Sequence, residues 1–303
     1  MAITRLDHAS IYVPDLGEAL AWYEDVLSMR VLERSPKHVH LSCFGGSAEL
    51  TLAKGACGLR DFTFGVDDES DFDRVERALC AHNITSNRTD EGARPGESAA
   101  LEFVIPSGHR MRLALGTSMH STGVTRMTSD GTHRPCDIDH INIIGETEPY
   151  QMRDFLLTLG FRFSFSIVMG GRPIAAWMRS SDFEHDLAYS AGARPGDSLH
   201  HVAFAVEDGN HYFRLSDRMM EHGRRWEFGP GRHNVSLGSP RGFGTNNYAY
   251  VKDPADNRNE FCADMDRVSD DAEPSVVEID PSRIGEVMNG WGFDHPESMM
   301  VGS

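Results

Sequence analysis

Apolar and polar residues follow the same order of patterns twice along this chain. Each half begins with a short apolar run, at residues 9–13 and 141–144. In the stretch that follows, residues 16–27 and 150–159, apolar residues recur every three or four positions. A short apolar run is consistent with a buried strand, and a spacing of three to four residues is typical of an amphipathic helix. The pattern therefore predicts a strand and then a helix at the start of each half.

A second set of elements is predicted further along each half. Apolar runs predict strands that begin near Phe62 and Val202, and helical spacing predicts helices over residues 70–81 and 211–222. The other strands are predicted at residues 39–43, 48–53, 100–104 and 111–115, and at 163–168, 175–178, 248–251 and 259–262. Each half is therefore predicted to be a pair of βαβββ units, and the chain to be an α+β protein.

Short motifs in matching order indicate that the halves are copies of one unit. Leu27 and Leu159 each lie 19 residues after the histidine of an Asp-His pair. The matched positions are His8 with His140, Asp61 with His201, and Arg112 with Glu260. Repeats of this length predict two similar modules in tandem.

The repeat also suggests boundaries. We expect a first module at residues 1–116, a linker at 117–135 rich in Ser, Thr, Gly and Met, and a second module at 136–265. The acidic tail, residues 266–303, contains one apolar island at 276–279 and a late Trp291-Gly292-Phe293.

Composition narrows the function classes. With 29 Lys plus Arg against 46 Asp plus Glu, the net charge of −17 disfavours nucleic acid or an anionic membrane as the main partner. No apolar run approaches the roughly 20 residues of a membrane span, and no basic and apolar leader opens the chain, so we predict a cytoplasmic protein. The five cysteines lack C-x-x-C spacing, which indicates neither a disulfide framework nor a zinc knuckle.

Only the second copy carries a complete set of metal-binding side chains, His140, His201 and Glu260. Two imidazoles and one carboxylate that leave open positions are typical of non-haem ferrous oxygenases. A lone strand histidine is more often a core or surface residue, but three candidate ligands at matching landmarks favour a metal site. His200 is the competing ligand; alternation should send it to the opposite face, and His201 is the residue in register with Asp61.

The chain resembles the type I extradiol ring-cleaving catechol dioxygenases of the vicinal oxygen chelate superfamily. The resemblance covers most of the chain. It is carried by Asp139-His140, by Leu199 to Phe204, by Gly229-Pro230-Gly231-Arg232-His233, and by Tyr250 through Asp253-Pro254 to Glu260. Ala176-Trp177-Met178, His185-Asp186 and Trp291-Gly292 are similar to the homoprotocatechuate 2,3-dioxygenase branch of that family.

The resemblance implies roles for individual residues. His140, His201 and Glu260 match the iron ligands, and His185 matches a histidine that moves protons during the reaction. Tyr250 and His233 match catalytic pocket residues, whereas Asn142, Trp177 and Arg232 match substrate-binding positions. Each has a plainer interpretation: Tyr250 as core, His185 as an exposed side chain, and Arg232 as a solvated cation.

The resemblance also implies a reaction. A catechol would be opened beside its two hydroxyls, with Fe(II), or in some members Mn(II), as the metal and dioxygen as co-substrate. A homo-oligomer is implied, with a tetramer favoured, and the tail could act as a lid. The stretch between His233 and Tyr250 is longer than the family leads us to expect, so the substrate stays open. Arg232, Arg241 or a tail residue could meet a substrate carboxylate, and an apolar ring substituent is equally compatible.

Two other classes of function remain as alternatives. One is a metal-dependent, glyoxalase-like isomerase or transferase of the same superfamily, although such sites commonly take ligands from two modules, and here the first module offers Asp61 and Arg112. The other is a ligand-sequestering module without catalysis, which would not need His185 and Tyr250 beside three metal ligands. Metal content and oxygen uptake distinguish the three classes.

Overall fold

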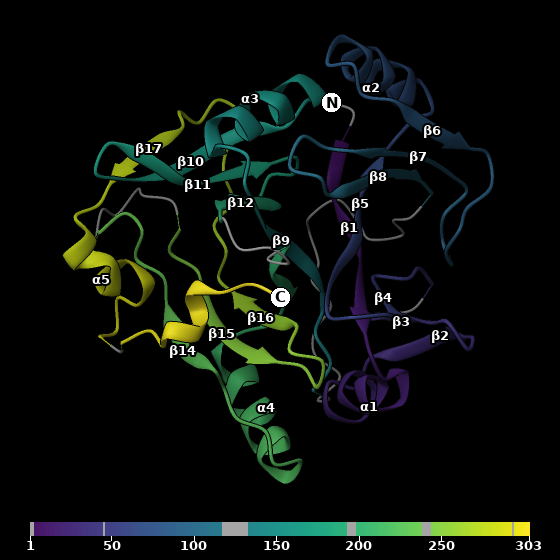
Figure 1. The fold of residues 1–303 in the computed structure, drawn as a ribbon. Helices are drawn as coiled ribbons and strands as arrows, with labels where there is room; N and C mark the ends of the chain where they lie inside the picture. Colours follow the sequence, from purple (N-terminus) through teal and green to yellow (C-terminus); the bar gives the residue numbers. More distant parts are fainter. Residues whose placement is uncertain (1–2, 45, 117–132, 193–197, 238–243, 293) are drawn as a thin grey trace.

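The computed structural model describes residues 3–44, 46–116, 133–192, 198–237, 244–292 and 294–303 (Figure 1). Most of the predicted linker, residues 117–132, lies outside the described residues, as do residues 238–243 with Arg241, and Phe293 of the tail. The described chain forms two mixed β-sheets that stand side by side, the first drawn in purple and blue and the second in teal to yellow (Figure 1).

The first sheet has eight strands in the order β2-β3-β4-β1-β5-β8-β7-β6. Its central strands, β1 and β5, are antiparallel to each other, and each has a parallel neighbour on its outer side, β4 and β8 respectively. The strands are β1 Ile3–Val13, β2 Arg30–Arg34, β3 His38–Ser42, β4 Leu50–Lys54, β5 Gly58–Val66, β6 Ser86–Thr89, β7 Ala99–Val104 and β8 Arg110–Leu115.

The second sheet repeats this arrangement and adds one strand, in the order β14-β15-β16-β13-β9-β12-β11-β10-β17. Here β9 and β13 form the antiparallel centre, with β12 and β16 as their parallel neighbours. The strands are β9 Asp137–Gly145, β10 Arg162–Met169, β11 Arg172–Arg179, β12 Leu187–Ala191, β13 Leu199–Ala205, β14 Phe228–Arg232, β15 Asn247–Lys252, β16 Arg258–Ala263 and β17 Ser275–Glu278. The predicted α+β class, with paired βαβββ units in tandem, is confirmed.

Helices lie between the first and second strands of each unit, close to where spacing predicts them. They are α1 Leu16–Ala21, extended by a π-helical turn Trp22–Val26, then α2 Ser70–Ala81, α3 Pro149–Leu159 and α4 Gly209–Glu221, with a short α5 Ile284–Met288 in the tail. Local chemistry sets their ends. The Asp208 carboxylate accepts from the Asn210 amide at the start of α4, and Gly160 ends α3 with a φ of 107°, which suits a residue without a side chain.

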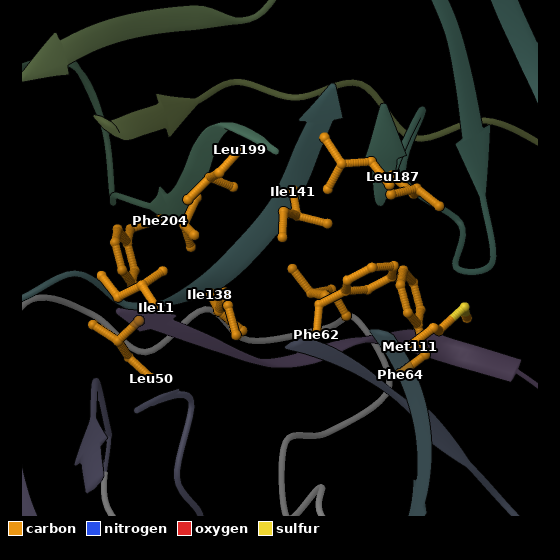
Figure 2. Close-up of a cluster of buried hydrophobic side chains, with 14 of the residues drawn as sticks. Ile11, Leu50, Phe62, Phe64, Met111, Ile138, Ile141, Leu187, Leu199 and Phe204 are labelled. Atoms are coloured by element: carbon orange, nitrogen blue, oxygen red, sulfur yellow. The ribbon is translucent and has the colours of Figure 1, made fainter. Parts of the chain in front are cut away.

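Apolar residues from both sheets pack into one core between them. Figure 2 shows Ile11 and Leu50 of the first sheet near Ile138, Leu199 and Phe204 of the second. Because neighbours on a strand face opposite sides, Ile141 joins this core while His140 and Asn142 face the other side of the second sheet.

Buried hydrogen bonds also join the two modules. Trp22 Nε1 donates to Asn259 Oδ1 at 2.9 Å, and the Tyr23 hydroxyl donates to Asp253 Oδ2 at 3.0 Å. Asn259 lies directly before Glu260 on β16, so the first module helps to position a strand that carries a candidate ligand.

No helix among the described residues is both long enough and apolar enough to span a membrane.

Candidate metal centre and active site

Three neighbouring strands bring His140, His201 and Glu260 together. His201 on β13 is the antiparallel partner of Asn142 on β9, and Glu260 on β16 is the parallel partner of Ala203. His140 Nε2 lies 3.1 Å from His201 Nε2 and 3.2 Å from Glu260 Oε2, and His201 Nε2 lies 3.0 Å from the same oxygen. Two imidazole nitrogens and a carboxylate oxygen thus converge on one point.

The other atoms of these side chains have partners that orient them. His140 Nδ1 lies 2.9 Å from Asp139 Oδ1, and His201 Nδ1 lies 2.7 Å from His200 Nδ1. All three candidate ligands are nearly inaccessible to solvent. Buried nitrogen and oxygen donors that converge and are held from behind fit one divalent metal ion, so the group is a possible metal site.

The charges of the group are strongly coupled. Burial lowers the proton affinity of His140, but Glu260 and Asp139 outweigh it and raise the pKa of His140 to about 10. Burial lowers the pKa of His201 to about 4, against the attraction of Glu260. Burial alone would raise the pKa of Glu260, but His201 and His140 hold it well below its ordinary value. The carboxylate is therefore ionised, and any metal must displace a proton from His140.

A cavity of about 360 Å³ opens onto the group. Its walls are polar near the candidate ligands and apolar elsewhere. The apolar lining comes from Ile144, Phe165, Ile167, Met169, Ile174, Ala175, Trp177, Ala191 and Val235, and from Ile284, Val287, Met288, Met299 and Met300 of the tail. None of the described lining residues is a lysine or an arginine.

His185 lines this cavity beside the candidate ligands and is buried. Its ring centre lies 4.3 Å from that of His140, and its Nδ1 lies 3.3 Å from Glu184 Oε1. The neighbouring Asp186 turns away and accepts hydrogen bonds from the Ser180 and Ser181 amides, at 2.8 and 3.0 Å. Asp186 therefore shapes the turn before β12, and only His185 of the pair reaches the cavity.

Tyr250 and His233 form a hydrogen-bonded pair on the cavity wall. The Tyr250 hydroxyl lies 3.0 Å from His233 Nε2, and His233 Nδ1 lies 2.9 Å from the Met288 carbonyl oxygen. Because a carbonyl only accepts, His233 Nδ1 carries a proton, and burial lowers the pKa of this histidine so that Nε2 accepts from the tyrosine. Burial and Glu260 raise the pKa of Tyr250 well above 10, so its hydroxyl keeps its proton.

The three predicted substrate-binding residues have different locations. Asn142 and Trp177 line the cavity, and the indole of Trp177 stacks on Phe165 with ring centres 4.4 Å apart. Arg232 does not line it. Its guanidinium donates to Asn247 Oδ1 at 3.0 Å and lies 3.8 Å from Asp264 near the surface, because the chain turns the next residue, His233, toward the cavity instead.

The prediction that strand alternation sends His200 to the face opposite His201 is wrong. Leu199 pairs with Ile143 and His201 with Asn142, so β13 carries one extra residue at this point, a β-bulge. The bulge leaves His200 on the cavity wall next to His201.

Other lining residues carry little sequence signal. Asn246, whose amide nitrogen lies 3.5 Å from Glu260 Oε1, belongs to the long stretch before Tyr250. Among the tail residues that complete the cavity, Ile284, Val287 and Met288 have helical spacing in the sequence, but this pattern does not indicate that they line a site.

The matching positions of the first module hold an internal ion-pair network. Arg94 donates to Asp61 and to Thr63, and lies 3.4 Å from Glu97. Arg112 Nη1 lies 2.8 Å from the same Glu97 oxygen. These side chains are buried and pair with one another. Asp61 therefore has a guanidinium as its neighbour, whereas His201, at the equivalent position of the second module, has the other candidate metal ligands as its neighbours.

Two pairs of βαβββ units in tandem, the second of which holds a buried group of two histidines and one carboxylate, define a tandem vicinal oxygen chelate protein with a possible metal centre. A family model described as "Glyoxalase/Bleomycin resistance protein/Dioxygenase superfamily" matches residues 5–113 and 137–261, and the chain belongs to this superfamily.

Within this superfamily, the chain is similar to several extradiol dioxygenases. A metapyrocatechase of Geobacillus stearothermophilus is 22% identical over 293 residues, 92% of this chain and 86% of that protein. A manganese-dependent 2,3-dihydroxybiphenyl 1,2-dioxygenase of Geobacillus genomosp. 3 is 22% identical over 267 residues, 83% and 82% of the two chains. The structure of homoprotocatechuate 2,3-dioxygenase from Brevibacterium fuscum with 3,4-dihydroxyphenylacetate has a TM-score of 0.81 and 26% identity, covering 98% and 91%. The predicted resemblance to type I extradiol dioxygenases is confirmed.

Proposed function

We propose that this protein is an extradiol catechol dioxygenase that opens an aromatic ring with dioxygen at a single Fe(II) held by His140, His201 and Glu260. The observation that carries the proposal is the convergence of these three side chains, within 4.8 Å of one another, at the polar end of a cavity that also contains His185, Tyr250 and His233. Iron bound there would act as a Lewis acid and bring catechol and dioxygen together. Mn(II) suits the same donors.

The surrounding residues have separate tasks. The Tyr250 hydroxyl, which donates to His233 Nε2, can transfer this hydrogen bond to one oxygen of a bound substrate and so orient it. His185 lies against the His140 ring, where its imidazole can accept a proton from the catechol and return it as the ring opens. The apolar wall excludes water from these transfers.

The cavity favours a catechol with an apolar ring substituent. A substrate carboxylate is usually paired with a lysine or an arginine, and none of the described lining residues is either. Phe165, Ile167 and Trp177 instead offer a surface on which a second ring or an alkyl chain can pack. The Arg232 side chain, which the sequence offered as a carboxylate partner, is engaged with Asn247 outside this wall.

The geometry also weighs against the isomerase alternative. All the candidate ligands belong to the second module, whereas Asp61 and Arg112 of the first module are bound in buried ion pairs.

Oxygen uptake tests the proposal. Protein purified anaerobically and reloaded with Fe(II) is given catechol, dihydroxybiphenyl and dihydroxyphenylacetate while absorbance follows ring opening. We expect one dioxygen consumed per catechol, a yellow product, the highest kcat/KM with dihydroxybiphenyl, and no uptake by Glu260→Ala. Tight metal binding without uptake for any catechol would overturn the dioxygenase proposal and favour the isomerase.

A further inference from the structure

The two adjacent histidines of β13 connect the candidate metal centre to the tail. His201 Nδ1 lies 2.7 Å from His200 Nδ1, and His200 Nε2 lies 2.8 Å from the carbonyl oxygen of Met299. The bulge at His200 makes this possible, because it places two consecutive side chains where a regular strand would place one. An unbroken line of contacts therefore runs from Glu260 through His201 and His200 to the tail backbone.

When a metal is bound, only one placement of the ring protons of His201 and His200 satisfies this line of contacts. A metal needs the lone pair of His201 Nε2, so the proton of the neutral ring must lie on Nδ1. His201 Nδ1 then donates to His200 Nδ1, which must be bare, and the proton of His200 lies on Nε2. That N–H requires an acceptor, and the Met299 carbonyl supplies it. His140 has a carboxylate, Asp139, in the corresponding place.

The Met299 carbonyl is itself firmly held. The buried guanidinium of Arg258 donates to the carbonyls of Ser298 and Val301, at 2.8 and 3.0 Å, on either side of Met299. The Glu227 carboxylate fixes this guanidinium through two hydrogen bonds of 2.8 and 3.0 Å.

Backbone pairing completes the attachment of the tail. Ser303 and Leu199 exchange N–H to carbonyl bonds of 2.8 and 3.1 Å, which lays the tail along β13 beside the bulge.

We propose that the tail segment 298–303 selects, through His200, the tautomer of His201 that binds metal, so that tail docking and metal binding are coupled. The inference rests on the proposed metal role of His201. His200 is a positioning residue, since it acts through His201. Coupling is reciprocal: if the docked tail strengthens metal binding, bound metal strengthens tail docking by the same factor.

The test uses the full chain loaded with Zn²⁺, a diamagnetic probe that takes the same donors. Nitrogen-15 NMR of the histidines should place the ring proton of His201 on Nδ1 and that of His200 on Nε2. His200→Leu should weaken Zn²⁺ binding about 10- to 100-fold in chelator competition, as loss of a ligand's hydrogen-bond partner does. His200→Gln, which can both accept and donate, should recover most of the affinity.

Hydrogen exchange tests the coupling. Zn²⁺ should slow exchange of the Ser198 and Leu199 amides, which donate to the Ser303 carbonyl, in the wild type but not in His200→Leu. His109→Leu is the matched control, because His109 is also buried and bonds a backbone carbonyl, that of Ser198, without touching a candidate ligand. Its Zn²⁺ affinity should stay near wild type.

Three results would overturn the inference. A proton found on His200 Nδ1, wild-type Zn²⁺ affinity in His200→Leu, or unchanged metal-induced protection in that variant would each do so and leave the proposed function standing. A wild-type protein that binds neither Zn²⁺ nor Fe(II) would overturn both.

Discussion

Asp61 and His201 occupy the same position in their two sheets. Each is the antiparallel partner of the residue that lies two places after the histidine of an Asp-His pair, Ser10 in the first module and Asn142 in the second. Each also follows a bulge of one extra residue. One strand arrangement therefore carries a buried ion pair in one copy and a candidate metal ligand in the other.

This equivalence supplies a matched pair of variants. His140→Gln should lose bound metal and oxygen uptake, because Nε2 is one of the three convergent donors. His8→Gln, at the corresponding place in the first module, should keep one metal per chain. His8 Nε2 contacts the Thr51 hydroxyl at 2.8 Å, so its loss should cost only about 1–3 kcal/mol of stability. Metal analysis of both purified variants checks this, and metal loss in His8→Gln would contradict it.

The ion pair of the first module should be essential for stability. Arg94→Leu leaves the buried Asp61 carboxylate without its closest cation, and we expect a loss of about 3–5 kcal/mol in urea unfolding, with metal content unchanged. The double variant with Asp61→Leu should recover part of that loss. Arg34→Leu breaks the exposed pair with Glu24 and should cost less than about 1 kcal/mol. Equal losses in the two single arginine variants would refute this account.

The repeat made the three candidate ligands predictable, because each lies on a strand at a register position that both modules share. Helices were predictable for the same reason, since amphipathic spacing depends on residues close together in the chain. The edge strands β2 and β6 were not predicted. Both are largely exposed and polar, so they lack the run of apolar residues from which the other strands were predicted.

The rest of the site depends on contacts between residues far apart in sequence. The side of the strand on which His200 lies could not be predicted, because a bulge breaks alternation without a sequence mark. Met299 contacts a residue 99 positions away, and Arg94 reaches Asp61 from a loop. Neither contact follows from local spacing.

Tyr250 should matter for catalysis through its hydroxyl. Tyr250→Phe removes the donor that His233 holds 3.0 Å away, and we expect kcat to fall about 100-fold with metal content unchanged. Tyr248→Phe is the control on the same strand. The Tyr248 hydroxyl is buried and has no hydrogen-bond partner among the described residues, so its removal should leave kcat within about twofold. Equal kcat values for the two variants, measured by oxygen uptake, would contradict a catalytic role for Tyr250.

Metal affinity should rise with pH. Glu260 and Asp139 outweigh burial and raise the pKa of His140 to about 10, so this histidine carries a proton at neutral pH that metal must displace. His201, with a pKa of about 4, has none to lose. The apparent Mn²⁺ dissociation constant should therefore fall about tenfold per pH unit between about 6.5 and 8.5. Calorimetry in buffers of different ionisation enthalpy should count one proton released. A dissociation constant independent of pH would refute this charge assignment.

A cation at the cavity mouth should change the preferred substrate. Met300 lines the cavity with 63% of its surface exposed, so an arginine fits there without disturbing the core. Met300→Arg should raise kcat/KM for dihydroxyphenylacetate relative to dihydroxybiphenyl by about tenfold, because the guanidinium can pair with the substrate carboxylate. Met220→Arg adds the same charge at an equally accessible position on α4, outside the cavity lining, and should leave the ratio unchanged. If both variants shift the ratio equally, the effect is general electrostatic attraction, and the apolar wall does not determine which ring substituent is preferred.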